Sequence, residues 1–177
     1  ACRAGSGVSG RPGRPAPGTP AAGGPAPGAA LGLPRLHLRL AGSTNDRARE
    51  LALAGAPQGT LVTASEQTAG RGRGGRRWSA PAGSSLLMSL VLRWQEGAQP
   101  PALLPLVAAL AICDVAGERA RIKWPNDVVV EQDGSLAKLA GVLTEARPQE
   151  GWAILGIGLN VAVDLAELPP ELRPGAP

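Results

Sequence analysis

The residues best suited to chemistry lie in one short run, from Gln67 to Trp78, which holds four arginines and four glycines. Apolar, strand-like segments precede and follow it. Glycine lets a backbone approach a ligand closely. Arginine adds a permanently charged fork that suits carboxylate and phosphate groups. The run therefore predicts a loop that binds an anionic ligand.

Three kinds of anion-binding loop could contain such a run. Gly70 to Gly75 has the spacing G-x-G-x-x-G, but a dinucleotide site requires a helix directly after it. Here residues 76–81 lead into another strand-like segment, and no Gly-Lys-Ser/Thr sequence follows for a P-loop. Arginine–glycine segments that bind nucleic acid are usually repeated and disordered. Nucleic-acid binding therefore stays open only as a minor alternative.

Four further motifs place polar or glycine residues beside apolar segments. They are Ser43-Thr44-Asn45, residues 123–127 (Lys-Trp-Pro-Asn-Asp), Lys138 before Leu139, and the glycines of residues 156–160. Each has an ordinary structural explanation: a capping box from Ser43 to Asp46, a β-turn, a charged strand edge, or close backbone packing. Taken singly, none of them decides between structure and function.

The elements that must position these motifs follow from hydrophobic periodicity. We expect helices over residues 43–55 and 100–117, the second buried between layers because it is apolar almost all round. Strands are expected over residues 36–40, 60–64, 84–92, 121–124, 128–130, 138–146 and 151–163, with a hairpin turn at Asp133-Gly134. This order predicts an α+β fold with a mixed, mainly antiparallel sheet.

Composition limits the remaining possibilities. A chain of 177 residues suits one folded domain. Residues 1–30 contain 22 Ala, Gly or Pro, so we expect residues 1–34 to be a disordered tail and residues 35–177 to form the domain. The two cysteines, Cys2 and Cys113, lack metal-ligand spacing. No apolar run is long enough to span a bilayer, and a cytoplasmic location is expected.

Together, and in this order, the motifs resemble the catalytic domain of biotin–protein ligases from about residue 36 to about residue 164. The resemblance implies a fold like that of class II aminoacyl-tRNA synthetases. It also implies activation of biotin by Mg²⁺-ATP to biotinyl-5′-AMP, then transfer to a lysine of a biotin carboxyl carrier protein domain. A lipoate or octanoate ligase or transferase of the same fold is the main alternative.

The resemblance also implies roles for individual residues. The biotin-binding set is Ser43, Thr44, Asn45, Gln67, Gly70, Arg71, Gly72, Arg73 and Lys138. The nucleotide-binding set is Arg71, Arg76, Lys123 and Asn160. The catalytic set is Lys138, Arg73 and Asp127, of which Asp127 would orient or deprotonate the incoming lysine. No metal ligand is assigned, and Trp78 is expected to pack beneath the loop.

The sequence departs from the family pattern at both ends. Residues 1–30 cannot form a helix-turn-helix, so DNA binding is not expected. The chain stops where relatives continue into further catalytic-domain structure and a small C-terminal barrel-like domain, which makes the predicted domain C-terminally short. A homodimer remains open.

Overall fold

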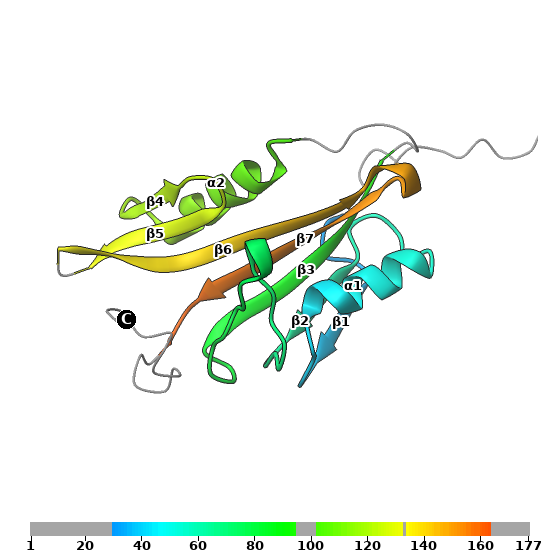
Figure 1. Cartoon of the computed structure of the whole chain (residues 1–177), viewed down its shortest axis with the longest axis horizontal. Helices are drawn as coiled ribbons and strands as arrows, with labels where there is room; N and C mark the ends of the chain where they lie inside the picture. The colour runs from blue at the N-terminus through cyan, green and yellow to red at the C-terminus, as the bar shows by residue number, and fades with distance from the viewer. Residues whose placement is uncertain (1–29, 95–101, 133, 164–177) are drawn as a thin grey trace, which may run out of the picture.

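The fold is one seven-stranded sheet with a helix on each face (Figure 1). The computed structural model describes residues 30–94, 102–132 and 134–163. The elements in chain order are β1 (Arg35–Leu38), α1 (Thr44–Leu53), β2 (Leu61–Ala64), the 3₁₀ turn η1 (Arg73–Gly75), β3 (Ser85–Arg93), α2 (Leu104–Ala116), β4 (Ala120–Lys123), β5 (Asp127–Gln132), β6 (Ser135–Arg147), the 3₁₀ turn η2 (Pro148–Glu150) and β7 (Trp152–Asn160).

The strands lie in the order β1-β2-β3-β7-β6-β5-β4. Among the described strands, β1 and β2 pair in parallel and every other neighbouring pair is antiparallel. The predicted α+β class with a mixed, mainly antiparallel sheet is confirmed. The longest strands, β3, β6 and β7, lie side by side at the centre (Figure 1).

Alternate residues of the central strands pack against different helices, as the period of two requires. In β3, Val91 belongs to a buried cluster with Ala48 of α1, whereas Leu90 packs in a second cluster with Ala109 and Ile112 of α2. Both cores are built from aliphatic and alanine side chains, apart from the buried Trp152. The sheet thus has an α1 face and an α2 face.

The start of α1 differs from the predicted capping box. Ser43 has the extended backbone of an N-cap residue, but its side chain makes no capping hydrogen bond. Asp46 forms an ion pair with Arg71 instead of reaching back to Ser43. The free N–H of Thr44 is satisfied by Gln67, whose Oε1 lies 2.7 Å from it. The cap therefore comes from a distant side chain, which a local pattern does not reveal.

The prediction that α2 is buried between two layers is wrong. Its small residues Ala108 and Ala109 pack on the sheet, whereas Val107 and Leu110 are more than half exposed. Hydrophobicity all round a helix indicates burial only where a second layer exists. Nothing within the described ranges covers the outer side of α2.

Four sequence predictions fall partly outside the described residues: the tail, the hairpin turn, the helix expected from residue 100, and the domain expected to extend to residue 177. Of the predicted tail, residues 1–29 are outside, while the N–H of Gly32 donates to the carbonyl of Gly59 at 2.8 Å. Asp133 of the predicted hairpin turn is also outside, and its neighbour Gly134 has a positive φ of 74°. No described helix is long and apolar enough to cross a membrane.

Candidate active site

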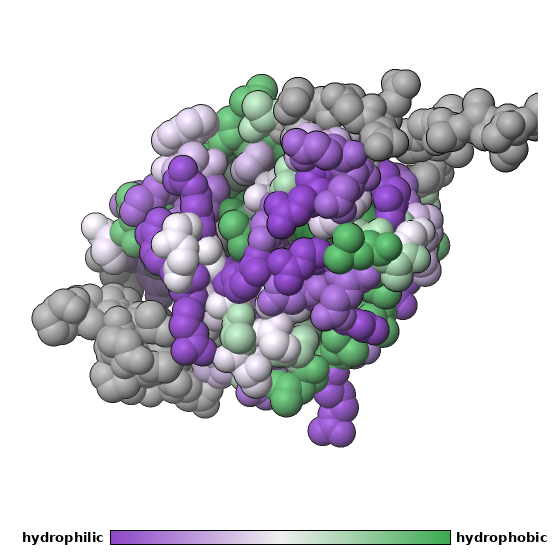
Figure 2. All heavy atoms as spheres, turned by 45° about the vertical axis from the view of Figure 1, so that its right-hand side comes forward, coloured by the Kyte–Doolittle hydropathy of each residue, from purple (hydrophilic) through white to green (hydrophobic). Residues whose placement is uncertain are grey.

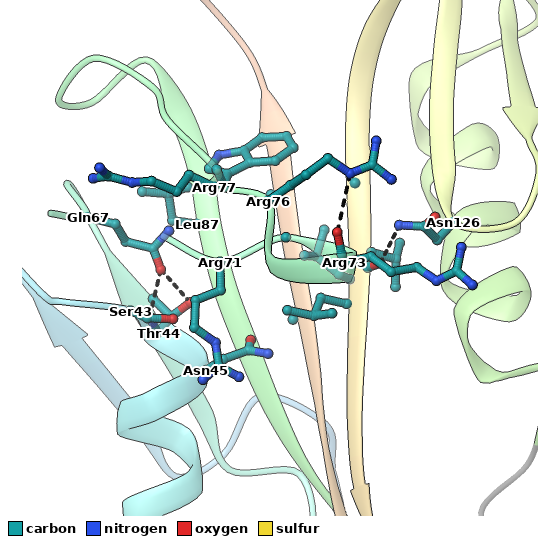
Figure 3. Close-up of a pocket in the computed structure, with 18 of the residues that line it drawn as sticks. Ser43, Thr44, Asn45, Gln67, Arg71, Arg73, Arg76, Arg77, Leu87 and Asn126 are labelled. Atoms are coloured by element: carbon teal, nitrogen blue, oxygen red, sulfur yellow. Dashed lines mark hydrogen bonds between the residues drawn. The ribbon is translucent and has the colours of Figure 1, made fainter. Parts of the chain in front are cut away.

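The predicted site residues meet in a cleft on the α1 face of the sheet (Figure 3). One wall is the first turn of α1, the other is the arginine loop, defined as residues 70–78, and the floor is formed by β3, β6 and β7. The cleft holds about 110 Å³. Pockets for small molecules are typically larger, from about 300 Å³, and this cleft adjoins a second hollow that shares Arg73, Asn126 and Leu143 with it.

The floor is built from glycines that leave room for two side chains. A Cβ on Gly156 would lie 2.0 Å from Oδ1 of Asn45. A Cβ on Gly158 would lie 2.5 Å from the ring of Trp78, and one on Gly141 would lie 3.0 Å from the same ring. Gly141 and Gly158 are direct neighbours across β6 and β7. Trp78 therefore packs beneath the loop, as predicted from the resemblance.

One end of the cleft carries neutral hydrogen-bonding groups (Figure 3). Gln67 Oε1 accepts from the N–H and the hydroxyl of Thr44, at 2.7 and 3.1 Å. Ser89, which is fully buried, lies 2.9 Å from the Thr44 hydroxyl and donates to Oδ1 of Asn45 at 2.7 Å. The amide nitrogen of Asn45 donates to Glu145 at 2.7 Å. These contacts fix which way both amides point and leave N–H groups of Gln67 and Asn45 for a ligand.

The opposite end is cationic. The arginine loop closes on itself through a 2.7 Å hydrogen bond from the N–H of Gly72 to the carbonyl of Arg76. Arg73 and Arg76 are exposed on the loop, and neither forms an ion pair within the described ranges. Figure 3 shows Arg73 beside Asn126, across the cleft from the neutral end. Arg76 Nε donates to the carbonyl of Arg73 at 3.2 Å, but no carboxylate balances either charge in the described residues, so both guanidinium groups can bind an anionic ligand.

Lys138 lies at the same end, on β6. Its Nζ is 2.9 Å from a carboxylate oxygen of Asp127 and 5.5 Å from the centre of the Trp78 ring. Two of the three residues that the resemblance assigns to catalysis, Lys138 and Asp127, are thus in direct contact. The acid and the aromatic face together hold the Lys138 ammonium group in place.

Arg71 differs from the other loop arginines because two carboxylates already hold it. Nη1 donates to Asp46 at 2.9 Å, and Nη2 donates to Glu145. Its side chain is about one-third exposed. The loop therefore begins with an arginine whose charge is balanced inside the protein.

Most of the predicted site residues line this one cleft. They are Ser43, Thr44, Asn45, Gln67, Arg71, Gly72, Arg73, Arg76, Asp127 and Lys138. Gly70 does not line the cleft. It packs against the backbone of the same loop, where a Cβ on Gly70 would lie 2.4 Å from the carbonyl oxygen of Trp78. Lys123 and Asn160 do not line the cleft. The Asn160 amide is occupied by Ser85 and by the carbonyl of Lys138, at 3.1 and 3.0 Å.

Sequence reasoning missed apolar lining residues such as Leu87 and Met88, and it also missed Ser89 and Glu145, which contact the lining from behind. Ser89 is the single hydroxyl in an otherwise apolar stretch of β3, and a lone polar residue there is the signal that could have identified it. Glu145 is an acid near the end of β6 and joins Asn45 to Arg71. Nothing in its sequence neighbourhood points to either partner.

A family model described as the biotin/lipoate A/B protein ligase family matches residues 38–162. The chain is 41% identical over 138 residues to the bifunctional ligase/repressor BirA of Bacillus subtilis, covering 74% of this chain and 41% of that protein. It is 42% identical over 142 residues to the biotin–[acetyl-CoA-carboxylase] ligase of Paracoccus denitrificans, covering 76% and 56%. The chain thus spans about half the length of these relatives.

Solved structures agree with the sequence comparisons. The biotin protein ligase of Aquifex aeolicus in complex with biotin and ATP superimposes with a TM-score of 0.61 at 33% identity, covering 78% of this chain and 56% of that one. The ligase of Leishmania major in complex with biotinyl-5-AMP superimposes with a TM-score of 0.59 at 29% identity, covering 73% and 57%. The chain belongs to the biotin/lipoate A/B protein ligase family.

Proposed function

We propose that this chain activates biotin with ATP to form biotinyl-5′-AMP and passes the biotinyl group to a lysine of a biotin carboxyl carrier protein domain. The observation that carries the proposal is the two-ended cleft, with neutral donors and acceptors at one end and unpaired guanidinium groups at the other. Biotin has the same division, with a neutral ureido ring and a carboxylate. The relatives described above are named as biotin ligases.

The neutral end would bind the ureido ring. Such a ring offers a carbonyl acceptor and two N–H donors, and burying it is favourable only if each finds a partner. Gln67 and Asn45 can supply N–H groups, and the hydroxyls of Ser43 and Thr44 can supply acceptors, because all four line the cleft. The buried Ser89 would hold the side chains of Thr44 and Asn45 in position through its contacts with both.

The cationic end would assemble the carboxylate with the α-phosphate of ATP. Arg73 and Arg76 can close over both anions and stabilise the charge that builds up when the carboxylate attacks phosphorus. Lys138 adds a compact ammonium charge at the acyl-phosphate oxygens. A closed loop would also keep water from the mixed anhydride that results.

Asp127 would serve the second step. A carrier lysine must lose a proton before its amine attacks the acyl carbon, and a carboxylate next to Lys138 is placed to accept that proton. No three His, Cys, Asp or Glu side chains in the described part of the chain are grouped to hold a metal ion. In this proposal Mg²⁺ arrives bound to the phosphates of ATP, as is usual for this ion.

Activation of lipoate or octanoate is the competing function within the family. Their ring or chain ends are apolar and would leave the donors and acceptors around Asn45 without partners, at a cost of about 1–3 kcal/mol for each buried group. This penalty favours biotin.

For the same chain we propose a cytoplasmic location, where carrier proteins are made.

The deciding experiment measures ATP–pyrophosphate exchange with biotin, lipoate and octanoate supplied separately. We expect exchange with biotin and at least tenfold less with the other two acids. Exchange with lipoate or octanoate alone would contradict the proposal. Mass spectrometry of a carrier domain incubated with the protein, biotin and Mg²⁺-ATP then tests transfer, which should add one biotinyl group to one lysine.

A further inference from the structure

Glu145 lies at the meeting point of the two walls of the cleft. It is on β6, and its side chain is about 30% exposed. One carboxylate oxygen, Oε2, accepts from the amide nitrogen of Asn45 at 2.7 Å, and the other, Oε1, accepts from Nη2 of Arg71. Asn45 belongs to α1 and Arg71 to the arginine loop. One acid thus touches the helix that forms the neutral end and the loop that forms the cationic end.

The contact with Asn45 decides how that amide is oriented. Its Oδ1 accepts from the buried hydroxyl of Ser89, and its nitrogen faces Glu145. Because an ionised carboxylate can only accept, the nitrogen cannot exchange places with the oxygen. Gly156 leaves the space in which the amide lies. The orientation of a group that lines the cleft is therefore set from behind by Glu145.

The contact with Arg71 anchors the loop. Asp46 and Glu145 hold the guanidinium from α1 and from β6. The loop beyond it has exposed arginines at Arg73 and Arg76 and no ion pair to hold it within the described ranges. Arg71 thus anchors the start of the loop by ion pairs, whereas its end is held by Trp78, which packs on the floor, and by Arg77, which donates to the carbonyl of Thr68 at 2.9 Å. In this structure Arg71 anchors the loop, and the contact with the anion that the resemblance implies for it stays a prediction.

We propose that Glu145 is a positioning residue for the reaction. It orients the Asn45 amide toward the ring of the substrate and ties the base of the arginine loop to the sheet. That this substrate is biotin rests on the proposed function, whereas the anchoring of the arginine loop by Glu145 does not depend on it.

The substitution that tests the proposal is Glu145→Gln, because it keeps the shape and removes one acceptor. A glutamine amide offers an oxygen on one side and an NH₂ group on the other. If the oxygen faces Arg71, the NH₂ group faces the NH₂ group of Asn45; if it faces Asn45, the NH₂ group faces the guanidinium. Either arrangement loses one hydrogen bond while the side chain keeps its volume. A change in this variant therefore shows that the two carboxylate contacts of Glu145 matter, and not only the space that its side chain fills.

The experiment compares four proteins: the unaltered chain, Glu145→Gln, Arg71→Met and the control Glu50→Gln. Glu50 is an exposed acid of α1 that pairs with Arg47 at 2.6 Å, away from the cleft. Biotin affinity is measured by calorimetry, and the rate of tryptic cleavage after Arg73, Arg76 and Arg77, which all four proteins share, is measured without ligand. Kinetics of biotin-dependent pyrophosphate exchange are then recorded.

We expect Glu145→Gln to weaken biotin binding and raise the KM for biotin at least tenfold, with kcat changed less than threefold. Cleavage of the loop should become at least fivefold faster. Arg71→Met should accelerate cleavage as much but weaken binding less, since it leaves the contact with Asn45 in place. Glu50→Gln should match the unaltered chain in both measurements.

Different results contradict the proposed function and the positioning role of Glu145. An unaltered chain that does not bind biotin contradicts the proposed function, and cleavage rates still decide whether Glu145 holds the loop. A chain that binds biotin, with no change in affinity or cleavage in Glu145→Gln, overturns the role of Glu145. If that variant does not fold, Arg71→Met decides the matter, because unchanged cleavage there also overturns the anchoring role.

Discussion

The position of Asn45 depends on the absence of a side chain at Gly156. A Cβ there would lie 2.0 Å from Oδ1 of Asn45, so Gly156→Ala must push the amide away from Ser89 and Glu145. An unsatisfied buried polar group costs about 1–3 kcal/mol, and about 1.4 kcal/mol corresponds to a tenfold change in affinity. We expect biotin to bind at least tenfold more weakly in calorimetry.

The matched control is another glycine at the same end of α1. A Cβ on Gly42 meets nothing within 4 Å, so Gly42→Ala should leave the affinity unchanged. Equal losses in both variants would contradict the specific contact between Gly156 and Asn45.

In the proposed function Lys138 supplies a charge for the chemistry, and its contribution to stability is expected to be small. Its side chain is 47% exposed, and its partner Asp127 is about three-quarters buried. Ion pairs near the surface contribute at most about 1 kcal/mol, whereas a charge aimed at a developing anion accelerates a reaction by about 10²–10³. Lys138→Ala should therefore lower biotin-dependent pyrophosphate exchange at least a hundredfold and change the melting temperature by only a few degrees.

The control for Lys138 is Arg47→Ala, which removes an exposed cation of α1 outside the cleft. Exchange should be unaltered in this variant. Exchange by Lys138→Ala at the rate of the unaltered chain would remove Lys138 from the mechanism.

Residues that act through a local motif could be predicted from the sequence, and residues that act through a distant contact could not. Asn45, Gln67, Arg73 and Lys138 each sit in a recognisable pattern, and all four line the cleft. Ser89 contacts partners 44 and 45 positions away, and Glu145 is 100 positions from Asn45. Only strand pairing brings such residues together, because it sets the register between β3, β6 and β7.

At the scale of elements, α2 shows the limit of reading burial from hydrophobicity. Ile112 is 8% exposed and packs with Leu90 and Val142, whereas Val107 is 58% exposed on the outer side. Deleting a buried isoleucine side chain costs about 2–5 kcal/mol, and an exposed substitution costs about 0.5 kcal/mol or less. Urea denaturation of Ile112→Ala and Val107→Ala should show this contrast.

Comparable losses of unfolding free energy in the two variants would mean that the outer side of α2 is covered in solution. The face of the described residues seen in Figure 2 is mainly hydrophilic with scattered apolar residues. An uncovered apolar helix side is unusual on such a surface.

The elements themselves follow from short-range patterns more reliably than their neighbours in the sheet. Alternation and apolar runs place every predicted strand on a strand of the structure, although β6 begins at Ser135 and not at Lys138. Periodicity carries no information on the central position of β7 between β3 and β6. That arrangement depends on long-range pairing and on the burial of both sheet faces.

At the scale of the whole molecule, the cleft joins segments from nearly the entire described chain. Its lining runs from Ser43 in α1 to Gly158 in β7 and includes residues of β3 and β6. A ligand that contacts all of them stabilises the domain as a unit, by about 2.7 kcal/mol at a concentration of one hundred times Kd. For a chain of 177 residues that corresponds to a rise in melting temperature of about 5–11 °C.

Hydrogen exchange locates this stabilisation. Saturating biotin should slow amide exchange in α1, in the arginine loop and in the central strands β6 and β7, because their contacts converge on the cleft. The outer residues of α2, such as Val115, face away from the cleft and are largely exposed, so their exchange should change least. Gly156→Ala should weaken the effect at the same biotin concentration, because its affinity for biotin is expected to be at least tenfold lower. Protection confined to the loop, with α1 and β6 unchanged, would show that the loop closes without the helix and that the two walls act independently.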